Sequence, residues 1–269
     1  MIIILIVILA LSLLALLLFF NIVFYVVEYY YSLVFGKPLF VHFYTHLKTL
    51  SPQEESILRQ KFQFYNSLTD KKKHYFRHRV AKFLESYTFI EREDFLITNE
   101  VKLLVAATYV MLTFGMRSYL IDEFDKIILY PDEYYSTVSE EYHKGEFNPR
   151  LKAVVFSWKD FLLGYEISND NLNLGIHEFT HVILFHGLKK NDASATIFSS
   201  RFNRLKKEVM HPPNRQRLIN SNYFRVYAYT NEFEFVSVII EHYFETPQDF
   251  KREFPELFLN VSLLLNYQP

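Results

Sequence analysis

The residues with the clearest chemical potential form one short stretch, His177-Glu178-Phe179-Thr180-His181. On a helix, His177 and His181 lie one turn apart and project from the same face. Two neutral imidazoles in that arrangement can bind a single Zn²⁺ ion, with Zn–N distances of ~2.0–2.1 Å. Glu178 stands near enough to take a proton from a water molecule at the metal without ligating the metal itself. The spacing therefore predicts a zinc site with an adjacent general base.

The surrounding sequence predicts the helix that this stretch needs. Asp170 or Asn171 can cap the start of such a helix, and Gly187 is typical of a helix end. Apolar residues such as Ile176 and Ile183 flank the two histidines, as expected for a helix that packs against a core. The alternative, two surface histidines beside a solvated glutamate, does not explain these flanks.

A catalytic zinc ion takes a third protein ligand and leaves its fourth position for water. His186 does not qualify, because five residues past the motif place it ~140° around the helix. His211, in a His-Pro-Pro loop, stays open as a candidate. The strongest candidates lie in a predicted helix over 231–245, where Glu234 and Glu241 are seven residues apart on one apolar face.

Each of these glutamates also has a second interpretation. A carboxylate that faces a core is costly unless it is paired or bound to a metal. Glu234 can instead complete a capping box with Asn231 at the start of the helix. Glu241 can accept a hydrogen bond from a ligand histidine and so fix its tautomer. The pattern alone leaves the third ligand open.

The composition narrows the chemistry further. The 269 residues include no cysteine, which excludes disulfide frameworks, cysteine zinc fingers, iron–sulfur clusters and thiol nucleophiles. Any metal must therefore be held by His, Asp or Glu. The formal net charge of −1 gives no global field that would attract nucleic acid, so we expect no nucleic-acid partner.

The first part of the chain is an expected membrane anchor. Residues 1–27 contain no Asp, Glu, Lys or Arg, and as a helix they are about 40 Å long, enough to cross a hydrocarbon core of ~30 Å. Four tyrosines between 25 and 31 provide an aromatic belt. A cleaved signal peptide is the alternative, but a basic n-region and an A-x-A site are missing. We predict a single-pass transmembrane anchor over 1–31, and Lys37 and Lys48 after it favour a cytoplasmic domain.

The remaining sequence predicts one α+β domain over 38–269. The expected elements are helices starting at Ser51 (with a capping box to Glu54) and near Asp70, a buried core helix over 103–116, strands over 126–130 and 151–158, and a loop from the second strand through Gly164. Seven basic or histidine residues between 71 and 79 are interpreted as a solvated helix face, with a membrane-surface or partner patch as the alternative.

Together these segments resemble the Mlc titration factor A (MtfA) family of zinc-dependent peptidases. The matching stretches are, in order, Val154–Trp158 with Asp160 and Gly164, Asn173 with the motif His177–His181, Tyr227–Phe235, Glu241, Tyr243-Phe244, Phe254–Leu257 and Tyr267–Pro269. Weaker similarity extends towards the N-terminus, so the resemblance covers about residues 50–269. Such blocks in the right order are far more specific than the five-residue motif alone.

The resemblance implies a zincin-like metallopeptidase fold of the α+β class, helix-rich with a small sheet. It implies His177, His181 and Glu234 as the zinc ligands and Glu178 as the general base. Tyr227 matches a family tyrosine that would polarise the scissile carbonyl. The implied function is zinc-dependent hydrolysis of a peptide or protein substrate at a membrane, and a regulatory protein partner is a further expectation.

In zincin folds, the strand before the zinc helix lets an extended peptide pair along its edge, and the strand over 151–158 occupies that place. Phe156 and Trp158 could shape substrate pockets, although core packing is the expected role of both. A function of another class is a membrane-tethered binding or regulatory module with a vestigial peptidase site. The intact Glu178 argues against it, because a purely structural zinc site has no use for a base.

Overall fold

The computed structural model describes residues 2–136, 140–167 and 169–268 of the chain. Its fold is helix-rich with a small sheet, preceded by one long apolar helix, and confirms the predicted α+β class. The elements are α1 (Ile2–Phe35), α2 (Pro52–Lys61), α3 (Gln63–Ser67), α4 (Asp70–Ser86), β1 (Thr88–Glu91), α5 (Asn99–Leu112), β2 (Lys126–Tyr130), β3 (Tyr134–Ser136), β4 (Glu141–His143), β5 (Gly145–Asn148), β6 (Ala153–Ser157), α6 (Trp158–Glu166), α7 (Leu174–Lys189), α8 (Ala193–Met210), α9 (Pro212–Asn220), the 3₁₀ helix η1 (Val226–Tyr229), α10 (Glu232–Glu245), α11 (Pro247–Glu253) and α12 (Pro255–Leu265).

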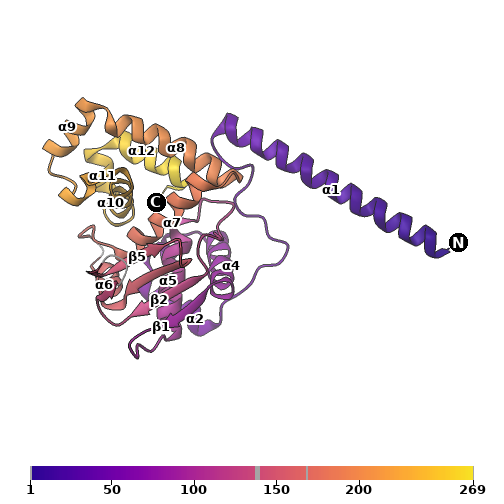
Figure 1. The fold of residues 1–269 in the computed structure, drawn as a ribbon, viewed down its shortest axis with the longest axis horizontal. Coiled ribbons are helices and arrows are strands. Elements are labelled where there is room, and N and C mark those ends of the chain that lie inside the picture. The colour runs from indigo at the N-terminus through magenta and orange to yellow at the C-terminus, as the bar shows by residue number, and fades with distance from the viewer. Residues whose placement is uncertain (1, 137–139, 168, 269) are drawn as a thin grey trace.

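Helix α1 projects from the rest of the molecule, with its N-terminus farthest from it (Figure 1). By length and composition it is able to cross a membrane. In the remainder, helices α8 to α12 gather on one side of α7, and the sheet with α2, α4 and α5 lies on the other (Figure 1). Helix α7 contacts α5, α8, α10, β5 and β6, so it is the element that joins the two layers.

The main sheet has the strand order β1-β2-β6-β5. Strands β1, β2 and β6 are parallel, whereas β5 runs antiparallel to β6 at the end of the sheet. The predicted strand over 151–158 is β6, but the expectation that it forms the sheet edge is wrong, because β5 covers that edge. All five residues of β6 are buried, as expected for a strand with both faces and both edges covered.

The segment after β6 corrects the sequence prediction. The chain does not form a loop through Gly164 but enters helix α6, whose start is capped by the hydroxyl of Ser157. Gly164 packs tightly there, since a Cβ at this position would lie 2.8 Å from the backbone at Leu172 and Asn173. Phe156 is fully buried and Trp158 stacks on the Phe161 ring, so both have the expected role in packing.

Two predicted helix starts in the first half of the domain are confirmed. Ser51 caps α2 and shares a reciprocal capping box with Glu54. Helix α4 begins at Asp70, but its basic face is not solvated throughout: Arg79 is fully buried. The Arg79 guanidinium donates to the backbone carbonyls of Thr113 and Met116, both at 2.9 Å, just beyond the end of the buried core helix α5. A buried cation there supplies hydrogen-bond donors to carbonyls at and beyond the end of the helix.

Candidate active site

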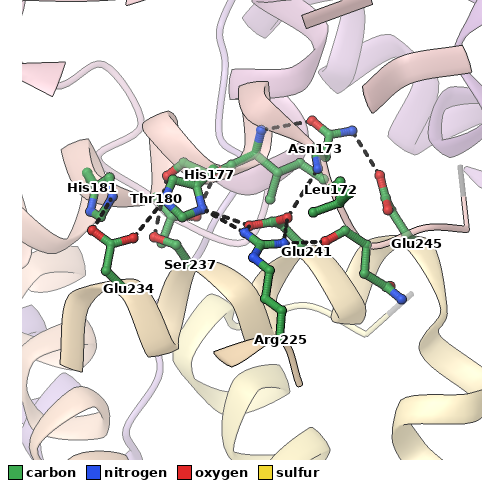
Figure 2. A network of polar contacts seen from close by, with 12 residues as sticks. Leu172, Asn173, His177, Thr180, His181, Arg225, Glu234, Ser237, Glu241 and Glu245 are labelled. Atoms are coloured by element: carbon green, nitrogen blue, oxygen red, sulfur yellow. Dashed lines mark hydrogen bonds and ion pairs between the residues drawn. The ribbon is translucent and has the colours of Figure 1, made fainter. Parts of the chain in front are cut away.

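Three side chains on two helices converge beside the sheet. His177 and His181 lie on α7, and Glu234 lies on α10. One donor atom from each of these residues lies within 4.8 Å of the other two. His177 Nε2 is 2.9 Å from Glu234 Oε2, and His181 Nε2 is 3.5 Å from Glu234 Oε1 (Figure 2). The structure thus brings together the three residues that the family resemblance implies as ligands.

Helix α7 positions the two histidines through its own start. Asn173, and not Asp170 or Asn171, is the N-cap, and its side chain accepts a hydrogen bond from the backbone of Ile176 over 3.0 Å. The His177 and His181 rings, four residues apart, have centroids separated by 4.9 Å. The helix continues to Lys189, so the prediction that Gly187 ends it is also wrong. Phe198 packs so closely that a Cβ at Gly187 would lie 2.5 Å from its ring, so packing explains this glycine.

The start of α10 places Glu234. The Asn231 side chain caps the helix by accepting from the backbone of Phe233 and Glu234, at 2.9 and 3.0 Å. The Glu234 carboxylate turns the other way, towards the histidines of α7, so it does not complete a capping box with Asn231.

Glu241 lies two turns further along α10 and contacts His177 at the ring nitrogen that does not face Glu234. The His177 Nδ1–H donates to Glu241 Oε1 over 2.7 Å. Arg225 donates two hydrogen bonds, of 2.7 and 2.8 Å, to the same carboxylate. The backbone N–H of Asn173 also donates to this carboxylate, over 3.1 Å (Figure 2). Of the two roles that the sequence leaves open for Glu241, the structure places it in the one that orients a histidine.

Nothing in the sequence pattern marks Arg225 as part of this network. It precedes η1 in an irregular segment, where no hydrophobic periodicity indicates which way a side chain points. Its partner Glu241 is fully buried in an otherwise apolar stretch. A buried carboxylate needs a positively charged partner, so Glu241 is the residue from which such a partner could have been inferred.

Glu178 is almost fully buried next to His177, facing the end strand of the sheet. Gly145 of β5 makes room for it, since a Cβ at that position would lie 2.8 Å from Glu178 Cγ. Burial raises the pKa of Glu178 to about 7, although the neighbouring His177 opposes this rise. A carboxyl group with a pKa near neutrality can both accept and return a proton.

His177 and Glu178 open on a cleft of about 550 Å³. Tyr227 on η1 lines this cleft and is half exposed, with its ring centroid 6.0 Å from that of His177. Burial of its hydroxyl, and then the nearby Glu234 carboxylate, raise the pKa of Tyr227 to about 12. Tyr227 is therefore a protonated hydrogen-bond donor at the rim of the candidate site.

The donor chemistry of the site fits a bound cation. Burial alone lowers the pKa of His177, but its hydrogen bonds to Glu234 and Glu241 raise this pKa to about 9. The two carboxylates therefore favour positive charge at this position, which a bound cation would also supply. Burial lowers the pKa of His181 to about 4, so its ring is neutral and its lone pair is free for a metal. Two imidazoles and a carboxylate are a usual ligand set of catalytic zinc.

Two other histidines considered from the sequence lie elsewhere. His186 points to another part of α7, where its ring nitrogens are 2.9 Å from Glu123 and 3.0 Å from Asp192. His211 is exposed between α8 and α9. Among the described residues, neither of these two belongs to the group formed by His177, His181 and Glu234.

Comparison with known proteins assigns the chain to a family of metallopeptidases. A family model described as "Glucose-regulated metallo-peptidase M90" matches residues 44–265. The chain belongs to this family. It is also similar to the uncharacterized protein slr2042 of Synechocystis sp. (strain ATCC 27184 / PCC 6803 / Kazusa), with 26% identity over 233 residues that cover 78% of this chain and 82% of that protein. The M90 match contains the whole candidate site and begins after α1 has ended.

Proposed function

We propose that this chain is a membrane-anchored zinc-dependent peptidase in which His177, His181 and Glu234 hold the metal. The observation that carries the proposal is the convergence of these three donors within 4.8 Å, next to a buried Glu178 that opens on a cleft. Membership of the M90 family supports a metallopeptidase.

Glu178 is the proposed general base. When bound, Zn²⁺ supplies Lewis acidity that polarises a peptide carbonyl and makes water more acidic. The Glu178 carboxylate then accepts the proton of the attacking water and transfers it to the nitrogen of the leaving amine, a role worth typically ~10²–10⁴ in rate. Its position one residue after a ligand brings it to the reacting water without using it as a ligand.

Tyr227 and Arg225 have supporting roles in this proposal. The Tyr227 hydroxyl would donate a hydrogen bond to the oxygen of the scissile carbonyl as negative charge develops on it. Arg225 fixes Glu241, and Glu241 fixes the orientation of the His177 ring. Each group acts from a position that the fold has already set, so little reorganisation accompanies the reaction.

The proposed substrate is a peptide or protein segment in extended form. Strand β5 pairs with β6 on one side and is the outer strand of the described sheet. Gly145 in β5 lies against Glu178, so a peptide paired along β5 would pass the base. This moves the proposed pairing edge from β6 to β5.

We also propose that α1 is an uncleaved single-pass anchor, with the enzyme domain on the cytoplasmic side. The apolar length of α1 supports the span, and Lys37 and Lys48 after it support the orientation. A regulatory protein partner, expected from the family resemblance, belongs to the same proposal.

The test is hydrolysis of a peptide library by the full chain in lipid vesicles. The wild-type chain should cleave peptides of the library. It should lose this activity when a chelator removes its metal and regain it when zinc is added. Glu178→Gln should lower the rate by ~10²–10⁴ and retain its zinc, because the base is lost and no ligand is. Glu166→Gln, the same change at an exposed position of α6, is the matched control and should leave the rate unchanged.

Loss of zinc from Glu178→Gln to the same extent as its loss of activity would contradict the role of Glu178. A wild-type chain that cannot retain zinc at all would contradict the enzyme proposal and favour an anchored binding module.

A further inference from the structure

The segment that follows α1 folds back along it. The chain reverses at Gly36, which has a positive φ of 59°. The ring of Phe40 then lies 5.8 Å from that of Phe24. Phe24 is eleven residues before the end of α1, or ~16 Å along the axis, and the five residues from Phe35 to Phe40 reach at most ~18 Å. These lengths let the linker fold back along α1 to the level of Phe24, through bends at residues 36, 37 and 39.

Other parts of the domain contact α1 at the same level. The Arg117 guanidinium lies over the rings of Phe24 and Phe40, 4.8 and 4.3 Å from their centroids, and forms an ion pair with Glu28. The Tyr25 hydroxyl donates to the backbone carbonyl of Asn191 over 3.4 Å. The domain thus touches α1 well before the end of the helix.

This level coincides with the expected boundary of a bilayer. Every residue from 2 to 23 is exposed, and Phe24 is the first half-buried residue of α1. Twenty-two helical residues span ~33 Å, close to the ~30 Å thickness of a hydrocarbon core. If α1 crosses a membrane, Phe24 and the Phe40 ring beside it lie where hydrocarbon gives way to headgroups.

The linker presents its apolar side chains away from the domain at this boundary. His42 stacks on Tyr75, with ring centroids 4.7 Å apart, and Tyr44 accepts a hydrogen bond of 2.7 Å from the buried Arg79. Between them, the Phe43 side chain is 72% exposed, although its ring lies only 5.5 Å from that of Phe40. The linker is held on the domain by its inward-facing residues, while an exposed phenylalanine is left next to the boundary.

We propose that this linker is a second membrane contact, in which Phe43 enters the lipid interface beside α1. The inference rests on the proposed transmembrane role of α1. The occupant is a lipid surface because the exposed ring is continuous with the Phe24 level of the span, and aromatic side chains favour the membrane interface. A lipid contact removes from water a large apolar side chain that the domain itself does not cover.

A second contact would set the height of the active site above the membrane. Helix α7 carries His177 near its start and ends at the cap residue Lys190, one residue before Asn191, whose carbonyl Tyr25 contacts. The thirteen residues from His177 to Lys190 measure ~20 Å, so, along α7, the site lies roughly this far from the part of the domain that contacts Tyr25. Because two contacts prevent the domain from pivoting on α1, substrates near the membrane surface would be favoured.

The experiment uses nitroxide spin labels on the full chain in phosphatidylcholine–phosphatidylglycerol vesicles. The chain has no native cysteine, so single-cysteine variants need no prior substitution. Phe43→Cys tests the linker. Leu96→Cys is the matched control, because Leu96 is 73% exposed in the segment between β1 and α5, while Leu14→Cys reports on α1 itself. Collisions with oxygen, which enters the bilayer, are compared with collisions with a nickel chelate, which does not.

We expect the Leu14 and Phe43 labels to favour oxygen, with the Phe43 label on the order of 5 Å below the headgroup boundary, and the Leu96 label to favour the chelate. A Phe43 label that favours the chelate, while Leu14 remains in the bilayer, overturns the second contact and leaves the anchor intact. A Phe43 label shielded from both reagents indicates a second copy of the chain on the linker and also overturns the proposal. A Leu14 label in water overturns the anchor and this inference together.

Discussion

Helix α7 carries a buried cluster of histidine and carboxylate at each end, and the two clusters are built differently. Near its start, His177 and His181 share the carboxylate of Glu234, His177 also contacts Glu241, and His177 lines a cleft of about 550 Å³. Near its end, His186 lies between Glu123 and Asp192, with ring nitrogens 2.9 and 3.0 Å from their oxygens. Both clusters contain residue types that bind metals.

The two clusters differ in the direction in which the pKa of a histidine is shifted, down for His181 and up for His186. Lys190 is 3.0 Å from Asp122 and 3.6 Å from Glu123, so the second cluster contains its own cations. The ring nitrogens of His186 lie 2.9 Å from Glu123 and 3.0 Å from Asp192, and although burial lowers the pKa of His186, these two carboxylates raise it overall. At the first cluster, Arg225 pairs with Glu241, while burial lowers the pKa of His181 to about 4, so a neutral imidazole lies beside the Glu234 carboxylate. Similar residue types therefore form the proposed metal site at one end of the helix and an ion-pair network at the other.

The largest expected effect comes from the same substitution at each end. His181→Gln should reduce the zinc content from about one ion per chain to almost none, because it removes a proposed ligand. His186→Gln should keep the zinc and lower the stability, because it disturbs a buried ion-pair network. Zinc content by plasma mass spectrometry and thermal unfolding measure the two effects. Equal zinc loss in both variants would contradict the distinction between the clusters.

A smaller effect is expected behind the ligands. Arg225→Ala should weaken zinc binding by ~10–100-fold, because Glu241 loses the bidentate partner that holds it against His177. Competition with a chelator of known affinity measures this change. Arg217→Ala, on an exposed position of α9, is the control. Unchanged affinity in Arg225→Ala would show that Glu241 and its other contact, the Asn173 backbone, suffice.

The smallest expected effect is a pH dependence of the stability that His186 contributes in the second cluster. Burial alone lowers the pKa of His186, but hydrogen bonds to Asp192 and Glu123 raise it above 6.5. The charged His186 therefore stabilises the fold fully below pH ~6.5, and this contribution disappears as the pH rises through the raised folded-state pKa. The measurement is the difference between the free energies of unfolding of the wild type and of His186→Gln. From about pH 6 to about pH 9 this difference should fall, by roughly 1.4 kcal/mol for each unit by which folding raises the pKa of His186. A difference that grows with pH would contradict the charged assignment.

The elements that the sequence predicts well are those with local causes. The capping box at Ser51 defines the start of α2, and the Asn231 cap defines the start of α10. The apolar run ended by Pro131 gives β2 with the predicted bounds. The spacing of His177 and His181 places them on one face because it needs only a helix.

Features that depend on distant residues are the ones that local pattern misses. Gly187 is a typical helix end by type, yet α7 continues because Phe198 of α8 packs against it. The edge position of β5 follows from pairing order, which no local pattern contains. The buried Arg79 is basic and lies among basic neighbours, and distant partners, the carbonyls after α5 and the Tyr44 hydroxyl, explain why it is inside. The third donor also depends on a distant element, and from pattern alone Glu234 was one of three candidates.

The central claim is that α7 and α10 together hold one zinc ion, and Glu234→Ala tests it most directly. Metal content of the full chain and of this variant should be measured side by side by plasma mass spectrometry. We predict about one zinc ion per wild-type chain and a sharp fall in Glu234→Ala, because the variant removes the one carboxylate donor of the set. Zinc retained at the wild-type level in Glu234→Ala would contradict the proposed ligand set.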